Sequence, residues 1–165
     1  MLATMIFTNR DGSGATGLAA LTLGSIVLVL ITLFHGGGLS RIIRHYKSLS
    51  NRLLERRRGL FHASVILGWT TYLILMLHII EVCGWAAILN ILHLTPDLHD
   101  AIYFCANSYT TLGLGYVLVP HAWREISPIM AMSGLFTFGY TTSVLFNLVG
   151  EQEILVEKLR SQRKA

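Results

Sequence analysis

Three apolar stretches, each long enough to cross a lipid bilayer, dominate this sequence of 165 residues. They run from Gly17 to His35, from Leu60 to about Ala87 and from Ile126 to Val149. An α-helix rises about 1.5 Å per residue, so roughly 20 apolar residues cover the hydrocarbon core. Only 13% of the residues are charged, whereas a soluble domain has about 25%. The sequence therefore predicts an all-α membrane protein with three transmembrane helices.

A basic segment, Arg41 to Arg58, separates the first two apolar stretches, and it holds seven Lys or Arg residues against one Glu. The run Gly36-Gly37-Gly38 before it predicts the end of the first helix. Four apolar residues of the segment recur at helical spacing and share one face: Ile42, Tyr46, Leu49 and Leu53. This pattern predicts a basic interfacial helix between spans one and two that binds anionic lipid. A solvated connecting helix is the alternative.

The distribution of basic residues also predicts the topology. Cytoplasmic loops are enriched in Lys and Arg, which places Arg41 to Arg58 inside and the N-terminus outside. The region from Asn90 to Arg124 has one basic residue and is expected outside, and the C-terminus is then cytoplasmic. The net charge of +4 follows this pattern, so no nucleic-acid partner is expected. We expect a multi-pass protein of the plasma (cell inner) membrane.

The region between the second and third apolar stretches has a different pattern. Thr95-Pro96-Asp97 is a helix-start signature, with a capping hydroxyl and Pro at the first position. The helix that it begins, running to Thr110, is too short to cross the membrane and is typical of a re-entrant segment. The next residues, up to Tyr116, include two glycines one residue apart. Glycine can adopt positive φ, and irregular backbone at membrane depth is tolerated where it lines a watery cavity.

The order of helix, re-entrant helix, glycine-containing loop and helix resembles the pore domain of the tetrameric potassium-channel superfamily, in its bacterial-style version with a single pore domain. The resemblance covers about Asp97 to Val149. Thr111-Leu112-Gly113-Leu114-Gly115 is similar to that family's Thr-Val-Gly-Tyr-Gly filter. The resemblance implies a passive cation channel, most simply for potassium, formed by a homotetramer. It implies potassium ions in the filter, no organic cofactor and no enzymatic activity.

The resemblance also assigns roles to individual residues. Backbone carbonyls would bind potassium at Thr111, Leu112, Gly113, Leu114 and Gly115. Filter support would come from Tyr103 and Phe104, in the places of an aromatic cuff, and from Asn107 and Tyr116. Gly134 and Gly139 would form the gating hinge, and Phe146 and Leu148 would narrow the cytoplasmic mouth. The chain then divides into an N-terminal part (1–58) with the first span, a pore domain (59–150) and a cytoplasmic tail (151–165).

Two filter positions depart from the family pattern. Leu114 replaces the filter Tyr, whose hydroxyl helps to hold the filter open, and Tyr116 replaces the Asp that follows it. A weakly selective cation channel is therefore an alternative function. Glu81, in the second span, is expected either to brace the re-entrant helix or to reach the interface.

Two alternatives come from other classes of protein. Histidines in or near the spans are potential axial ligands of a small haem-binding membrane redox protein: His35, His62 and His78. A membrane scaffold subunit without transport is the other. Cys83 and Cys105 have neither the spacing nor the neighbours of a metal site, and we expect both to be free thiols.

Overall fold

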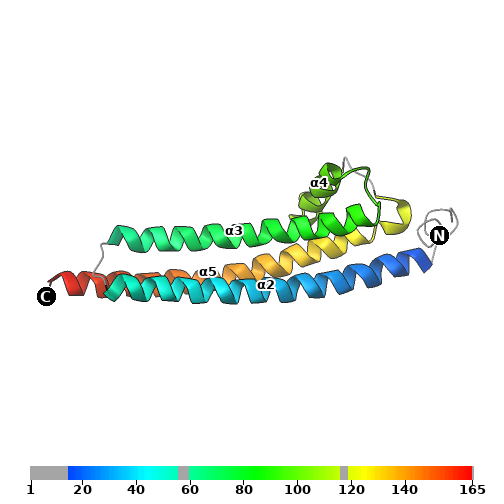
Figure 1. Ribbon diagram of the computed structural model, residues 1–165. Coiled ribbons are helices and arrows are strands. Elements are labelled where there is room, and N and C mark those ends of the chain that lie inside the picture. Colours follow the sequence, from blue (N-terminus) through cyan, green and yellow to red (C-terminus); the bar gives the residue numbers. More distant parts are fainter. Residues whose placement is uncertain (1–14, 56–59, 116–118, 165) are drawn as a thin grey trace. The chain divides into compact units, whose positions relative to one another are not determined.

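The computed structural model describes residues 15–55, 60–115 and 119–164, and within them the chain is helical without a strand. The helices are α2 (Ala15–Glu55), α3 (Leu60–Ile91), α4 (Leu98–Tyr109) and α5 (Ile126–Lys164), with a 3-10 turn η1 (His121–Trp123) before α5 (Figure 1). Three helical segments of the described chain are long and apolar enough to cross a membrane. They lie in α2, in α3 and in His121–Gln162, which includes most of α5. The predicted all-α membrane fold with three spans is confirmed.

The chain forms two compact units, and each long helix contributes to both. The first unit contains the described chain up to Leu33 together with Ile79–Thr137. The second unit contains Phe34–His78 and the chain from Phe138 onward. We describe each unit by itself.

The core of the first unit is built where α2, the C-terminal part of α3, α4 and the start of α5 meet. Trp85 is fully buried there. A methyl group added at Gly24 would come within 2.8 Å of Ile129 Cδ1, so glycine lets α2 approach α5 closely. The fully or almost fully buried members of the cluster include Ala20, Ala86, Leu89, Ala101, Cys105, Tyr109, Ile126 and Met130.

The basic segment differs from the sequence-based expectation. The first helix does not end at Gly36–Gly38, because α2 continues through these glycines to Glu55. The side chain of Leu77 fills the space that a Cβ on Gly38 would need, with Cδ1 only 2.7 Å away. Glycine is therefore used here for close helix packing rather than for helix termination.

The apolar residues of the basic segment do share one face of α2, and this face packs against α3 and α5. Tyr46 and Leu53 are buried, and Tyr46 donates a hydrogen bond to Gln152 Oε1 at 3.2 Å. The expectation of an interfacial helix with this face in lipid is therefore wrong. A helix of 41 residues is roughly 60 Å long, about twice the hydrocarbon thickness, so its basic part extends beyond the membrane core.

The C-terminal tail is also continuous with the preceding span, because α5 runs without a break to Lys164. Leu155 and Leu159 are buried in a small cluster with Leu53 and Ala63 of the same unit. The sequence expectation of a cytoplasmic tail did not include this packing, because the residues that Leu155 and Leu159 pack against, Leu53 and Ala63, are distant along the chain. The division into segments 1–58, 59–150 and 151–165 stays a prediction.

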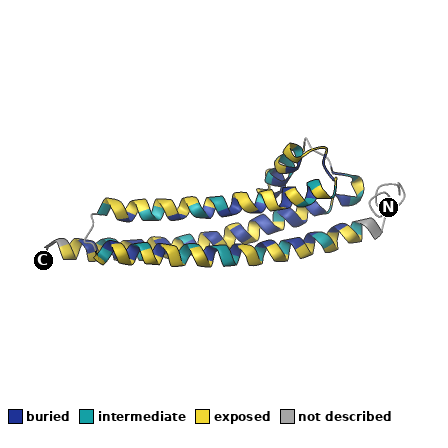
Figure 2. Ribbon diagram, in the orientation of Figure 1, coloured by how far each residue is buried: buried dark blue, intermediate teal, exposed yellow. Residues whose placement is uncertain are grey.

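Exposed positions run along the three long helices, as Figure 2 shows in yellow, and many of them carry large apolar side chains. Examples with more than half of their surface exposed are Leu18, Ile26, Leu30 and Leu33 in α2, Val65 and Leu75 in α3, and Leu135 and Phe136 in α5. Exposed apolar surface on this scale indicates contact with lipid or with other protein chains. It is consistent with a multi-pass membrane protein.

Candidate ion-conducting site

The site begins with α4, whose first turn is capped by a side chain. The carboxylate of Asp97 accepts a hydrogen bond from the amide of Asp100 at 2.8 Å, so Asp97 is the N-cap. The sequence signature placed the capping hydroxyl at Thr95, but Thr95 Oγ1 instead donates to the carbonyl of Asp97 at 3.3 Å. The short helix was predicted correctly, and its cap lies two residues later than expected.

The C-terminal end of α4 is closed by a two-bond turn. The amide of Thr111 donates to the carbonyl of Ser108 at 3.0 Å, and the amide of Leu112 donates to that of Asn107 at 2.9 Å. This is the Schellman pattern, which requires a left-handed residue after the helix. Thr111 takes that position with φ of 59°, where glycine is usual. A β-branched residue there costs roughly 1–3 kcal/mol, which the surrounding structure must offset.

The stretch after α4 is not helical, as the sequence predicted. Thr110 to Gly115 are exposed in the single chain. Gly113 has φ of 71°, and its amide lies 3.4 Å from the carbonyl of Asn107. Left-handed residues thus recur at two positions, Thr111 and Gly113, separated by one residue. Tyr116, which the sequence placed next to the filter, lies outside the described residues.

Asn107 supports this stretch by its main chain. Its carbonyl accepts from the amides of Leu112 and Gly113, while its side-chain Nδ2 donates to the carbonyl of Tyr103 in the preceding turn at 2.8 Å. Its Oδ1 is buried and has no hydrogen-bond partner among the residues that the structure describes. Phe104 packs against the core of the first unit and Tyr103 is half-buried. Their role as an aromatic cuff stays a prediction.

Tyr109, the last residue of α4, is held at its hydroxyl by two other helices. The hydroxyl donates to Glu81 Oε2 of α3 at 2.6 Å and lies 2.6 Å from Thr137 Oγ1 of α5. Burial, and then the hydrogen bond to Glu81, raises the pKa of the Tyr109 phenol above its usual range, so the phenol remains a donor. Of the two expectations for Glu81, bracing of the re-entrant helix is confirmed.

Gly134 of α5 lies against the main chain of the same residue. A Cβ on Gly134 would overlap the carbonyl oxygen of Tyr109 and approach its Cγ within 3.3 Å. Gly139 has open space, with nothing within 4 Å of an added Cβ. Both glycines lie inside the continuous helix α5. Their role as a gating hinge stays a prediction, and for Gly134 the structure adds a packing requirement that the sequence did not reveal.

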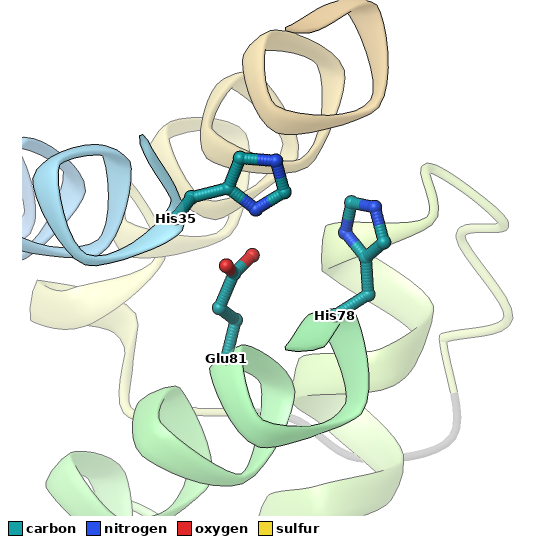
Figure 3. A group of neighbouring side chains, drawn as sticks. All are labelled: His35, His78 and Glu81. Atoms are coloured by element: carbon teal, nitrogen blue, oxygen red, sulfur yellow. The ribbon is translucent and has the colours of Figure 1, made fainter. Parts of the chain in front are cut away.

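The second unit contains two buried histidines that share one hydroxyl. His35 Nε2 and His78 Nε2 each lie 3.0 Å from Thr141 Oγ1, and the ring centroids are 5.0 Å apart. Imidazole is a common metal ligand. Figure 3 draws both rings with Glu81, which follows His78 by one turn of α3 and belongs to the first unit. His62, the other histidine considered as a haem ligand, is exposed near the start of α3.

The two residues expected at the cytoplasmic mouth lie in different surroundings. Phe146 is 82% exposed, whereas Leu148 is buried among the side chains of its own unit. The sequence missed this difference because both positions are apolar and only helix packing separates their faces. The role of both residues in narrowing a cytoplasmic mouth stays a prediction.

Comparison with known families agrees with this arrangement. A family model described as an ion channel matches residues 64–151, which is more than half of the chain and includes α4, the exposed stretch and most of α3. The chain belongs to this ion channel family, and the resemblance to the potassium-channel pore is confirmed at that level. No curated protein and no solved structure matches the sequence.

Proposed function

We propose that four copies of this chain form a passive, non-enzymatic cation channel that conducts potassium through the backbone carbonyls of Thr111 to Gly115. The observation that supports it most strongly is the stretch itself. It is non-helical, exposed in the single chain and directly follows a capped helix. Left-handed residues at Thr111 and Gly113 favour carbonyls that turn toward one side, and a ring of such carbonyls can replace the hydration shell of a cation.

The electrostatics of α4 favour a cation at this place. The C-terminal end of a helix carries roughly half a negative charge, and α4 ends where the stretch begins. Asp97 and Asp100 lie at the other end of α4, where four copies would form a ring of acidic side chains at the outer mouth. Asp97 also serves as the N-cap, so its charge has both roles.

A weakly selective cation channel is the second candidate, and Leu114 is the observation that favours it. Leu114 is 48% exposed and has no hydroxyl to bond behind the carbonyls. The ligands would still be main-chain oxygens, so conduction survives while discrimination between potassium and sodium weakens. Reversal potentials in mixed sodium and potassium separate the two candidates.

The exposed basic side chains of α2 support the proposed orientation and lipid partner. Arg41, Arg44 and Arg52 are exposed, whereas the apolar face of the same segment is occupied by α3 and α5. Anionic headgroups attract such residues by about 1 kcal/mol each near the surface. We place this segment and the C-terminus on the cytoplasmic side of the plasma membrane and the N-terminus outside.

Potassium flux into liposomes that contain the purified protein tests the proposal. The parent should conduct, its assembly should have the mass of four chains, and Gly113→Ala should abolish flux because alanine disfavours φ of 71°. Gly84→Ala is the matched control, since an added Cβ meets nothing within 4 Å there. Absence of potassium flux from the parent, or equal flux from Gly113→Ala and Gly84→Ala, refutes the carbonyl filter.

A further inference from the structure

We infer that Glu81 and Thr137 are positioning residues for the filter, acting through the hydroxyl of Tyr109. This inference rests on the proposed function, because it assigns the residues that fix the start of the proposed ion-binding stretch. All the contacts that carry it lie within the first unit.

Tyr109 is the covalent link between α4 and the exposed stretch, and it is 1% exposed. It is fixed at two points that are several bonds apart. At its side-chain end, the hydroxyl meets Glu81 and Thr137 at 2.6 Å each. At its main chain, the carbonyl lies over Gly134, where no Cβ fits. A residue held at both ends cannot rotate about its backbone without breaking one of these contacts.

The two contacts that α5 makes with Tyr109 come from a single turn of that helix. Gly134 and Thr137 are three residues apart and therefore lie on the same face. Thr137 Oγ1 is also within 3.1 Å of the carbonyls of Ser133 and Gly134, so the hydroxyl that meets Tyr109 is oriented by its own helix. A displacement of this turn of α5 would move the end of α4 with it.

Glu81 gives the contact its strength. The side chain is 2% exposed inside a membrane-spanning helix, where a carboxylate is costly unless it is hydrogen-bonded. The hydroxyl of Tyr109 provides such a bond by donating to Glu81 Oε2. Packing alone does not require a carboxyl group at this position, because an apolar side chain could also fill a buried site in a membrane-spanning helix. Its contact with Tyr109, the last residue of α4, does give it a role.

The turn that follows is the part that Tyr109 controls. The amides of Thr111, Leu112 and Gly113 are bonded to carbonyls in the last turn of α4. These bonds keep Thr111 in the left-handed conformation that the chain would otherwise avoid. Once the end of α4 is free to move, this strained residue can relax, and the carbonyls after it lose their common direction.

Hydrogen exchange and permeability in nanodiscs or liposomes test the inference together. Tyr109→Phe and Glu81→Leu remove the hydrogen bond, and Glu81→Gln keeps an acceptor. Tyr46→Phe is the matched control, because it removes another buried tyrosine hydroxyl from a bond to Gln152 in the second unit. The assembled mass and helical content of each variant are measured first, and Glu81→Gln serves as the folded reference if Glu81→Leu does not assemble.

We expect exchange of the amides of Thr111, Leu112 and Gly113 to become at least about tenfold faster in Tyr109→Phe, and the potassium-to-sodium permeability ratio to fall. Glu81→Gln should retain most of the parent's protection of these amides. Tyr46→Phe should change neither the exchange rates nor the permeability ratio. Unchanged exchange in Tyr109→Phe, or an equal change in Tyr46→Phe, overturns the inference. If the parent does not conduct, the proposed function fails, while the exchange rates still decide whether these residues fix the turn.

Discussion

Replacing Gly134 with alanine tests whether this position is a packing site or only a flexible hinge. The added methyl group would overlap the carbonyl oxygen of Tyr109, which belongs to the main chain and cannot rotate away as a flexible side chain would. The helices α4 and α5 would have to separate locally. Gly139→Ala, five residues further along the same helix, adds the same methyl group into open space.

The expected magnitudes follow from these two environments. Alanine is more favourable than glycine inside a helix by about 1 kcal/mol, so Gly139→Ala should stabilise slightly or have no effect. Overpacking costs about 1–3 kcal/mol, and Gly134→Ala should reach the upper end because its neighbour is backbone. After the gain in helix propensity, we expect Gly134→Ala to lose on the order of 2 kcal/mol relative to Gly139→Ala.

Thermal unfolding of the detergent-solubilised assembly, followed by circular dichroism, measures the difference between the two variants. Amide exchange of the stretch after α4 is measured alongside, because displacement of Tyr109 should expose it. A hinge without a packing role predicts equal stability for the two variants and altered opening in both. If Gly134→Ala unfolds at the same temperature as Gly139→Ala, the reasoning from the Tyr109 carbonyl is refuted.

Three further outcomes are expected. Thr111 is a β-branched residue in the left-handed conformation, so Thr111→Gly should leave the stability unchanged or raise it by about 1 kcal/mol. The same change removes one hydroxyl from the proposed filter. The potassium-to-sodium permeability ratio should therefore change without a loss of thermal stability. Burial raises the pKa of the Cys105 thiol to about 12, so at pH 8 only roughly one thiol in ten thousand is ionised. A water-soluble maleimide should therefore leave Cys105 unlabelled in the folded protein and label it after denaturation; rapid labelling of the folded protein would contradict its burial. Lys47 Nζ lies 3.1 Å from Glu151 Oε1 on the surface of the second unit, and the two side chains are 56% and 42% exposed. Lys47→Ala should therefore lower the free energy of unfolding by less than about 1 kcal/mol. This difference should disappear at high salt.

The local features of this protein could be inferred from the sequence because their causes are local. Three spans follow from the length and composition of the apolar stretches. The short helix α4 follows from Pro96 and Asp97 at its start, and the irregular stretch after it follows from its two glycines. These signals also give the family, since the filter resemblance and the family match fall in the same region.

The tertiary structure decided what each residue contacts. Gly36–Gly38 predicted a helix end, but Leu77 packs against Gly38 and the helix continues to Glu55. Gly134 looked like a hinge, and the carbonyl of Tyr109 lies against it. A glycine signals only that a side chain is absent; whether that absence serves a turn or a close approach depends on the neighbouring helix.

The same limit applies to the polar and apolar side chains of the spans. Glu81 gave two equally reasonable expectations until Tyr109 was found 2.6 Å from its carboxylate, 28 residues away in the sequence. Phe146 and Leu148 are alike in composition, yet one is exposed and the other buried. The sequence by itself determined that there are three spans, a short helix and a non-helical stretch after it, because backbone propensity and hydrophobic length are properties of short segments. The contacts between helices were decided only in three dimensions, because burial and hydrogen bonding depend on residues that are distant along the chain.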